Sequence, residues 1–532
     1  MATIVIPTSG TGSRLGKRTE YTNKSLLKVG DMYALTHILR LYPPTSKFII
    51  TLGHFGEHVQ EYLSLAHPDL SITYAHVDRY EGKGTSLGYS LLQARHLLQT
   101  PFIFHCCDAL CKSPPPPIEG WGLYVSSAPS ADSYASITVS SDSTVKELHH
   151  KGSPLFDFVY TGIARIEDPL LFWNLLERLY QANPDNTSLS DVHVFRWLLE
   201  KGYPFSYKVL SDWYDTGTPD CYEKTLEAFP TTYSVLSKPD ESLCFLETSV
   251  IKFFADKAIC QKRIQRGLQL HPSAPKLLGW SDHFFKMEKI HGQTVEKCLE
   301  VNTVKKVLEW GWETLWSHQQ TDSAYIDQCY EFYMKKTTTR LESLRLERDE
   351  ALCVNGLYTG SWKDLLKRVD MGLLETDTFS YFHGDFIFEN LLVEPSGSFR
   401  LIDWRQDFCG NLVYGDFCYD LAKLRHNLFF THGNIISDLY TINYTDSTVY
   451  LDMKCNYSLI HQEDSIQSFC LEKGISYKKV QVLTALIWLN MAPLYEGKLQ
   501  AFLFYLGKYT LARILMPSHM HPEDEQHPKA DK

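Results

Sequence analysis

The sequence predicts two consecutive globular folds: an α/β domain with a mostly parallel sheet over residues 1–230, and an α+β domain of two lobes over residues 241–516. Three observations support this. A chain of 532 residues is long enough for several domains of ordinary size. The first part alternates short apolar runs with helical patterns, as a sheet covered by helices on both faces does. The second part begins with apolar strand-like runs and then becomes helical.

The segment between the two domains is rich in Pro, Ser and Thr, so residues 231–240 are predicted to be a linker. The polar tail 517–532 is expected to be disordered. A formal charge of −11 argues against nonspecific nucleic-acid binding, which needs clustered cations. No export signal or stretch of about 20 apolar residues is visible, which predicts a cytoplasmic protein without membrane insertion.

The first domain is expected to start with a buried strand at residues 2–7, and later apolar spacing predicts helices at 170–179 and 191–201.

Thirteen cysteines without paired short spacings indicate reduced thiols. Cys106, Cys107 and Cys111 lie close in sequence, so a metal cluster is conceivable. Their apolar neighbours favour a role as small buried hydrophobic residues.

A glycine-containing segment follows the first strand directly. Glycines after a strand allow close approach to an anion, whose phosphates backbone N–H groups can bind. The predicted nucleotide-binding residues here are Gly10, Thr11, Gly12 and Ser13. A Rossmann dinucleotide site is the competing interpretation. It is disfavoured because Leu15 replaces the third glycine of that motif and no acidic residue ends a second strand near position 35.

Four further stretches occur with this segment: Asn23–Leu27, Gly53–Val59, Gly84–Gly88 and Trp213–Tyr222. Together they resemble the nucleotidyltransferases that make nucleotide-sugars and CDP-alcohols, whose fold is Rossmann-like. The last stretch is similar to the family's Trp-x-Asp-x-Gly-Thr-Pro-x-x-Tyr. The stretch Asn23–Leu27 stands where the family has Pro-Lys, so the lysine is retained as Lys24 and the proline is replaced by Asn23. The resemblance also implies that Gly84 and Thr85 lie near the nucleotide.

Nucleotidyl transfer brings a phosphate monoester to the α-phosphate of an NTP, so two anions must meet. A divalent metal held by carboxylates, with added cations, offsets this repulsion and stabilises the departing pyrophosphate. Asp108 and Asp215, each at a strand end, are the predicted metal ligands. Arg14 and Lys24 are the predicted catalytic cations. Capped turns are the alternative explanation for the two aspartates.

The stretch Phe382–Asn390, followed by Leu401–Trp404, carries the second set of chemical groups. Transfer of the ATP γ-phosphate needs a carboxylate that accepts the hydroxyl proton, and oxygen ligands for Mg²⁺. The spacing predicts Asp385 as the base and Asn390 and Asp403 as metal ligands.

These residues resemble the aminoglycoside phosphotransferase and choline kinase superfamily, over residues 240–515. The resemblance implies a bilobal, protein-kinase-like fold. It further implies that Lys252, in the strand 249–254, contacts ATP phosphates. Phe284–Gly292 is similar to the segment that receives adenine, with Glu288 and Ile290 as nucleotide-binding residues. The segment Gly415–Lys423 matches the family region whose acidic residues often hold the active-site loop or the acceptor.

Two departures from the family pattern are visible. No glycine precedes Lys252, so a glycine-rich phosphate lid is not evident, and the predicted helix 255–268 offers no glutamate to pair with this lysine. Gln261 is the nearest polar substitute. A catalytically inactive fold is therefore an open alternative, although Asp385, Asn390 and Asp403 are intact. A protein kinase is disfavoured because no Ala-Pro-Glu segment follows Asp403.

Together the two halves predict a bifunctional enzyme. The second domain would phosphorylate a small-molecule hydroxyl with ATP and Mg²⁺. The first would couple that phosphate to a second NTP (CTP, UTP or GTP) with Mg²⁺, releasing pyrophosphate. The product would be an activated sugar or polyol for glycan or surface-polymer synthesis. The alternatives are CDP-choline or CDP-ethanolamine synthesis, and one catalytic domain with a regulatory nucleotide-binding partner. The acceptor, the NTP base and a possible homo-oligomer remain open.

Overall fold

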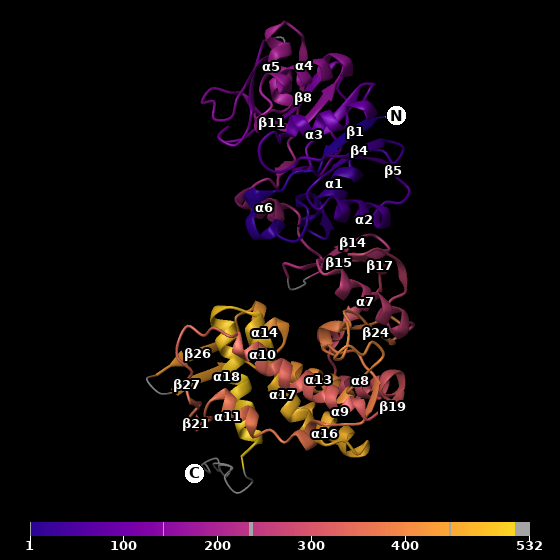
Figure 1. Ribbon diagram of the computed structural model, residues 1–532, viewed down its shortest axis with the longest axis vertical. Coiled ribbons are helices and arrows are strands. Elements are labelled where there is room, and N and C mark those ends of the chain that lie inside the picture. Colours follow the sequence, from indigo (N-terminus) through magenta and orange to yellow (C-terminus); the bar gives the residue numbers. More distant parts are fainter. Residues whose placement is uncertain (1, 142, 234–237, 446–447, 517–532) are drawn as a thin grey trace, which may run out of the picture. The chain divides into compact units, whose positions relative to one another are not determined.

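The structure is a computed structural model that describes residues 2–141, 143–233, 238–445 and 448–516. The chain forms two compact units (Figure 1). Unit 1 comprises Met1–Gln261 and Leu277–Lys289, and unit 2 comprises Lys262–Lys276 and Ile290–Lys532. The predicted disordered tail 517–532 lies outside the described residues.

The large sheet of unit 1 has nine strands, in the order β10-β9-β11-β6-β1-β4-β5, with β8 and β12 branching from β11. Only β10 and β11 run against the other seven strands, which confirms the predicted α/β fold with a mostly parallel sheet. The strands are β1 (Thr3–Pro7), β4 (Lys47–Leu52), β5 (Ser71–His76), β6 (Phe102–His105), β8 (Trp121–Ser126), β9 (Ser136–Val139), β10 (Val145–His149), β11 (Phe158–Ile166) and β12 (Phe205–Val209).

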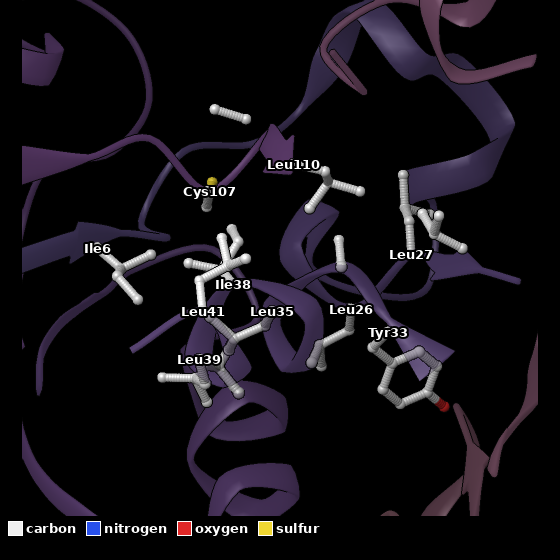
Figure 2. Close-up of a cluster of buried hydrophobic side chains, with 14 of the residues drawn as sticks. Ile6, Leu26, Leu27, Tyr33, Leu35, Ile38, Leu39, Leu41, Cys107 and Leu110 are labelled. Atoms are coloured by element: carbon white, nitrogen blue, oxygen red, sulfur yellow. The ribbon is translucent and has the colours of Figure 1, made fainter. Parts of the chain in front are cut away.

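Helices cover both faces of this sheet because alternate residues of its strands point to opposite sides. Ile4 and Ile6 of β1 pack into a core with α1, α2 and α6, whereas Val5 packs into a second core with α3, α4 and α5. Figure 2 shows part of the first core around Ile6 and Leu35. The helices are α1 (Ala34–Arg40), α2 (Gly56–Ala66), α3 (Leu87–Gln93), α4 (Pro169–Ala182), α5 (Asp191–Glu200) and α6 (Pro219–Ala228). Both predicted helices, 170–179 and 191–201, correspond to α4 and α5.

Two short strand pairs complete this part of the unit. They are β2 (Lys28–Val29) with β3 (Met32–Tyr33), and β7 (Ala109–Cys111) with β13 (Trp213–Asp215). Cys107 and Cys111 are buried in the first core, as the apolar interpretation predicts, and Cys106 is half-buried.

A second sheet in unit 1 has the order β14-β15-β17-β16 and is antiparallel throughout. Its strands are β14 (Glu241–Phe245), β15 (Ser249–Phe254), β16 (Leu277–Trp280) and β17 (Phe284–Glu288), and the helix α7 (Lys257–Leu270) follows β15. The apolar strand-like runs predicted at the start of the second part therefore form strands, and the strand 249–254 has the predicted bounds.

This second sheet packs against α2 and the first core. Ile251, Phe253 and Phe284 belong to the same buried cluster as residues of β1 and α1. Glu61 of α2 accepts hydrogen bonds from Ser281 Oγ (2.8 Å) and His283 N (2.9 Å), and its other oxygen lies 3.1 Å from His283 Nδ1. The part of the predicted linker that is described also contacts the first domain, since Asp31 Oδ1 accepts hydrogen bonds from Thr231 and Thr232.

Unit 2 is mainly helical, with small sheets, as expected for the larger lobe. Its helices are α8 (Thr303–Gly311), α9 (Ala324–Tyr330), α10 (Lys336–Glu342), α11 (Trp362–Lys367), α12 (Met371–Leu374), α13 (Phe417–Phe429), α14 (His432–Ile436), α15 (Tyr457–Ile460), α16 (Glu463–Glu472), α17 (Tyr477–Met491) and α18 (Gly497–Ile514). Its strands are β18 (Gln293–Thr294), β19 (Gln319–Thr321), β20 (Cys353–Val354), β21 (Leu357–Tyr358), β22 (Thr378–Tyr381), β23 (Leu391–Val393), β24 (Phe399–Leu401), β25 (Tyr414–Gly415), β26 (Tyr440–Tyr444) and β27 (Thr448–Met453).

The apolar stretch after residue 480 forms two packed helices, α17 and α18 (Figure 1). Residues 482–489 of α17 are all buried. A helix surrounded by protein on every side needs no polar face. Within the described residues, no helix is long and apolar enough to cross a membrane.

We expect Glu61→Ala to destabilise unit 1, because three donors of the turn at Ser281–His283 lose their charged acceptor. The loss should be about 2 kcal/mol in the free energy of unfolding, since hydrogen bonds to charged groups contribute about 1.5–3 kcal/mol. Urea denaturation measures it. Gln60→Ala, at the exposed neighbouring position, serves as the control and should change stability much less. Equal effects of the two substitutions would contradict the role of Glu61.

Candidate active sites

A pocket of about 710 Å³ opens at the carboxyl ends of β1 and β6 in unit 1. Its lining includes most of the residues predicted from the sequence: Gly10, Thr11, Gly12, Ser13, Arg14, Lys24, Thr85, Asp108 and Asp215. Gly84 is not part of the lining. Gly84 has a φ of +80°, which favours glycine, and a Cβ there would lie 3.2 Å from Arg79 Nη1. It precedes Thr85, which does line the pocket.

The glycine-containing segment after β1 is fixed at its start. Thr8 Oγ1 donates to the carbonyl of Thr51, and the carbonyl of Ser9 accepts from His54 N at 3.0 Å. A Cβ at Gly53 would lie 2.6 Å from this carbonyl, so the close contact between the loop and the end of β4 requires glycine there. Gly12 has a φ of +66°, and the turn formed by it leads into Ser13 and Arg14.

Lys24 reaches the carboxylate of Asp108 inside the pocket. Its Nζ lies 3.1 Å from Asp108 Oδ2, and both side chains are largely buried. Asn23 positions this lysine: it caps the following turn through Ser25 N, and its amide donates to the carbonyls of Thr8 and His54. Burial raises the pKa of Asp108, but Lys24, with a smaller contribution from Arg14, lowers it to about 2. Asp108 is therefore a carboxylate at neutral pH.

The pairing of β7 with β13 brings Asp215 to Asp108. Asp215 is opposite Ala109 in this ladder, and Thr216 N donates to the carbonyl of Asp108 at 2.9 Å. A Cβ placed on Gly217 would lie 3.0 Å from Asp215 Oδ1 and 3.2 Å from Asp108 Oδ2. The two carboxylates thus border one small space, to which Arg14 Nη2 also comes within 3.7 Å.

Two carboxylates this close repel each other. The pKa of Asp215 is raised by burial and by the charge of Asp108. Tyr134 partly offsets this by donating a hydrogen bond to Asp215 Oδ2 at 2.9 Å. Two carboxylates around a shared space provide the hard oxygen ligands that suit a divalent cation such as Mg²⁺. Asp108 and Asp215 would hold that cation.

Sequence reasoning missed several residues of this pocket, including Tyr134, Lys151, Tyr160 and Asp191. Tyr160 donates a hydrogen bond to Asp191 Oδ2 at 2.7 Å, and burial raises the pKa of Asp191 to about 6. Tyr134 and Lys151 lie in loops, Tyr160 lies in β11 and Asp191 begins α5, so the four residues form no compact motif. The one available signal was Asp191 itself, a carboxylate at the start of a predicted helix.

The second set of candidate residues lies in unit 2, between β22 and β24. Asn390 Nδ2 donates to Asp385 Oδ2 (3.1 Å) and to its carbonyl (2.9 Å). Lys423 of α13 places its Nζ 2.8 Å from Asp385 Oδ1. Burial alone would raise the pKa of Asp385, but Lys423 holds it well below its usual range. The predicted base is therefore ionised and oriented by two neighbours.

Asp420 holds the loop that carries Asp385. Its carboxylate accepts hydrogen bonds from His383 N (2.8 Å), Gly384 N (2.7 Å) and the indole of Trp316 (3.2 Å). Gly384 has a φ of +86°, and a Cβ there would lie 2.5 Å from that of Arg405. The other acidic residue of this family segment, Asp416, caps α13 and lies 2.8 Å from Lys479 Nζ. Both carboxylates are thus engaged within the fold.

Asp403 follows β24, as predicted, with a positive φ of 55°. Its Oδ1 accepts from Arg263 Nη1 of α7 at 2.9 Å, and the adjacent residue Ile402 donates its N–H to the carbonyl of Asn390. The charge of Asp403 also raises the pKa of Asp385. Asn390 and Asp403 are brought to one region, and a metal there would compete with Arg263.

Lys252 is buried at the centre of β15 in unit 1, and its Nζ lies 3.4 Å from Glu241 Oε2 of β14. A strand residue therefore supplies the carboxylate that the helix lacks. Gln261 does not substitute for it, since its amide donates to the carbonyls of Ser281 and Asp282. Glu288 is the last residue of β17, and the chain returns to unit 2 at Ile290.

Residues 258–444 match the model of the phosphotransferase enzyme family, which confirms the resemblance for this segment. No curated protein matches the chain. Solved structures similar to its N-terminal part are nucleotidyltransferases.

One is CTP:phosphocholine cytidylyltransferase from Streptococcus pneumoniae, with 14% identity, 43% of this chain and 99% of that chain covered, and a TM-score of 0.38. A putative glucose-1-phosphate thymidylyltransferase from Bacillus anthracis has 20% identity, covers 45% and 98%, and has a TM-score of 0.37. The inositol-1-phosphate CTP transferase from T. maritima has 14% identity, covers 43% and 96%, and has a TM-score of 0.35.

We expect Gly217→Ala to weaken divalent-metal binding in the unit 1 pocket by about tenfold or more. The added methyl group would occupy the space between Asp108 and Asp215 without removing either ligand. Titration with Mn²⁺ followed by electron paramagnetic resonance measures the affinity. Gly10→Ala is the matched control, since a Cβ at Gly10 meets no atom within 4 Å. Unchanged Mn²⁺ affinity in Gly217→Ala would contradict the assignment.

Asp420→Asn should loosen the loop around Asp385. An asparagine offers one acceptor oxygen to two loop N–H groups, and its amide would face a donor. The buried unsatisfied group should cost about 1–3 kcal/mol. Urea denaturation and faster amide exchange at His383 and Gly384 measure the effect. Asp438→Asn, at a side chain that is 69% exposed, is the control. Full protection of both amides in Asp420→Asn would argue against this role.

Proposed function

We propose that this protein is a bifunctional enzyme. Its second part phosphorylates a hydroxyl of a small molecule with ATP, and its first part couples the resulting phosphate to a second NTP and releases pyrophosphate. The product of one reaction is the kind of substrate that the other needs. The chain combines a nucleotidyltransferase-like region with a phosphotransferase-family segment, and this combination is the starting point of the proposal.

One observation carries the first reaction: Asp108, Asp215, Arg14 and Lys24 line one pocket with the glycine-containing segment. The two carboxylates would hold Mg²⁺, which would offset the repulsion between the two phosphates. Arg14 and Lys24 would neutralise negative charge that develops on the pyrophosphate. The backbone N–H groups of Gly10–Ser13 would bind the phosphates of the NTP.

For the second reaction, the support is an ionised Asp385 oriented by Asn390 and Lys423. Asp385 would accept the proton of the acceptor hydroxyl as the oxygen attacks the γ-phosphate. Asn390 and Asp403 have the oxygen donors that suit Mg²⁺, which would neutralise charge on the phosphates. Lys252 would contact the ATP phosphates, and the segment around Glu288 and Ile290 would receive adenine.

The ion pairs of Asp385 with Lys423 and of Asp403 with Arg263 favour a second candidate, in which only the nucleotidyltransferase part is catalytic and the kinase-like part is a regulatory nucleotide-binding module. Under the main proposal, Asp403 would hold Mg²⁺ in place of its ion pair with Arg263. The substrates of the bifunctional enzyme would be small molecules, and both reactions would take place in the cytoplasm. The products would serve glycan or surface-polymer synthesis.

Substituting Asp215→Asn and Asp385→Asn separately tests the proposal. Each substitution should lower one half-reaction by at least about 10³-fold and leave the other within about twofold, because each removes one charged group from one site. Pyrophosphate release and ADP release, measured with Mg²⁺, report the two reactions, and EDTA should stop both. Glu57→Gln, on the exposed side of α2, is the control. Unchanged ADP release in Asp385→Asn would overturn the kinase assignment and favour the regulatory candidate.

A further inference from the structure

Lys336 and Arg340, one turn apart on α10, and Arg405, which follows β24 beside the loop that carries Asp385, are three cationic side chains. We call them the cation group. Arg405 N donates to the carbonyl of His383 at 3.0 Å, and its Cβ lies against Gly384. The Arg405 guanidinium and Lys336 Nζ both lie over the ring of Phe332, at 4.9 Å and 4.3 Å from its centre.

The nearby carboxylates are already paired with other cations. Asp385 pairs with Lys423, Asp403 with Arg263, Asp407 with Lys262 and Glu331 with Lys335. Across the described ranges of the chain, no carboxylate oxygen lies within 4.0 Å of a nitrogen of the cation group. Arg405 Nε and Arg340 Nη1 instead donate to the carbonyls of Asp407 and Asn490.

The cation group is also costly in this position. Burial, together with the charges of Arg405, Arg340 and Lys423 and against that of Asp407, lowers the pKa of Lys336 to about 6. At neutral pH this lysine is therefore mostly uncharged, and an anion that binds beside it would favour its protonated form. Like charges brought together in a partly buried place destabilise a fold unless an anion joins them. Lys336 and Arg405 remain half-exposed, so an anion from solution can reach them.

The acidic residues near the loop are not available for a cationic acceptor. Asp420 accepts the two loop N–H groups, and Asp416 is paired with Lys479 and accepts from the hydroxyl of Tyr333. Both are fully buried. A quaternary ammonium would need a free carboxylate or an open aromatic face. The ring of Phe332 is instead contacted by the protein's own Lys336 and Arg405 and is stacked on Phe408.

We infer that the acceptor of the phosphotransferase reaction is an anionic hydroxy compound, whose carboxylate or phosphate binds the cation group while its hydroxyl meets Asp385. Guanidinium groups bind carboxylates and phosphates in bidentate geometry, and Arg405 and Arg340 supply them. This inference rests on the proposed kinase function and narrows its substrate class from sugars, polyols and amino alcohols to acidic members.

Titration calorimetry on the full chain tests the binding of an anion. Sulfate, D-glycerate and D-gluconate are the anionic probes, glycerol and D-sorbitol their neutral counterparts, and choline the cationic one. We expect at least one anion to bind at least tenfold more weakly to the triple variant Lys336→Gln/Arg340→Gln/Arg405→Gln than to the unchanged protein. Lys367→Gln, at a side chain that is 77% exposed, should bind like the unchanged protein.

The triple variant should fold, because it removes like charges, and its melting temperature checks this. Should it fail to fold, Lys336→Gln alone is titrated, with at least a threefold loss expected. Equal anion affinity in the folded variant and the unchanged protein overturns the inference.

ADP release with the same compounds separates this inference from the proposed function. Turnover of an acid at least 100-fold above its neutral counterpart, with a raised KM for the acid and an unchanged KM for ATP in the variant, supports it. A raised KM for ATP alone means that the cation group binds nucleotide and overturns it. If choline or a neutral polyol is the best acceptor and turnover requires Asp385, the inference fails while the kinase function stands.

Discussion

The approach of two carboxylates, Asp108 and Asp215, is the constraint on which the architecture of unit 1 depends. Like charges in a partly buried pocket separate unless the backbone holds them and cations compensate for them. The short ladder between β7 and β13 supplies the first requirement. Lys24, held by Asn23, supplies part of the second. The long segment between the two aspartates builds the rest of the pocket wall, including Tyr134, which donates to Asp215.

Unit 2 meets a similar constraint with a different arrangement. Asp385 and Asp403 lie on either side of the β23–β24 hairpin, and each is paired with a cation from a helix, Lys423 or Arg263. The buried Asp420 accepts hydrogen bonds from two N–H groups of the loop that carries Asp385. Charge is therefore compensated locally at each carboxylate. Arg405 and its neighbours Lys336 and Arg340 are different, since no carboxylate oxygen of the described residues lies within 4.0 Å of their nitrogens.

The sequence predicted the fold well because its strong signals are local. The apolar run before Gly10 and the glycines after it determine a strand and a turn with no help from distant residues. The placement of Lys24, Asp108 and Asp215 in one pocket also agreed with the motifs. Partners that depend on distant packing were not predictable. Glu241, which lies beside Lys252 from the next strand, and Arg263, which pairs with Asp403, belong to no short motif.

The packing of helix α2 limits where this protein can be cut into fragments that fold. The turn that precedes α2 is fastened to the carbonyl of Ser9, and the outer face of the helix is covered by the strands that begin at Glu241. A fragment ending near residue 230 would leave Tyr62 and its apolar neighbours facing water, and such a fragment is prone to aggregate. The complementary fragment would lose the support of its small sheet. A cut near residue 230 would therefore divide one packed core.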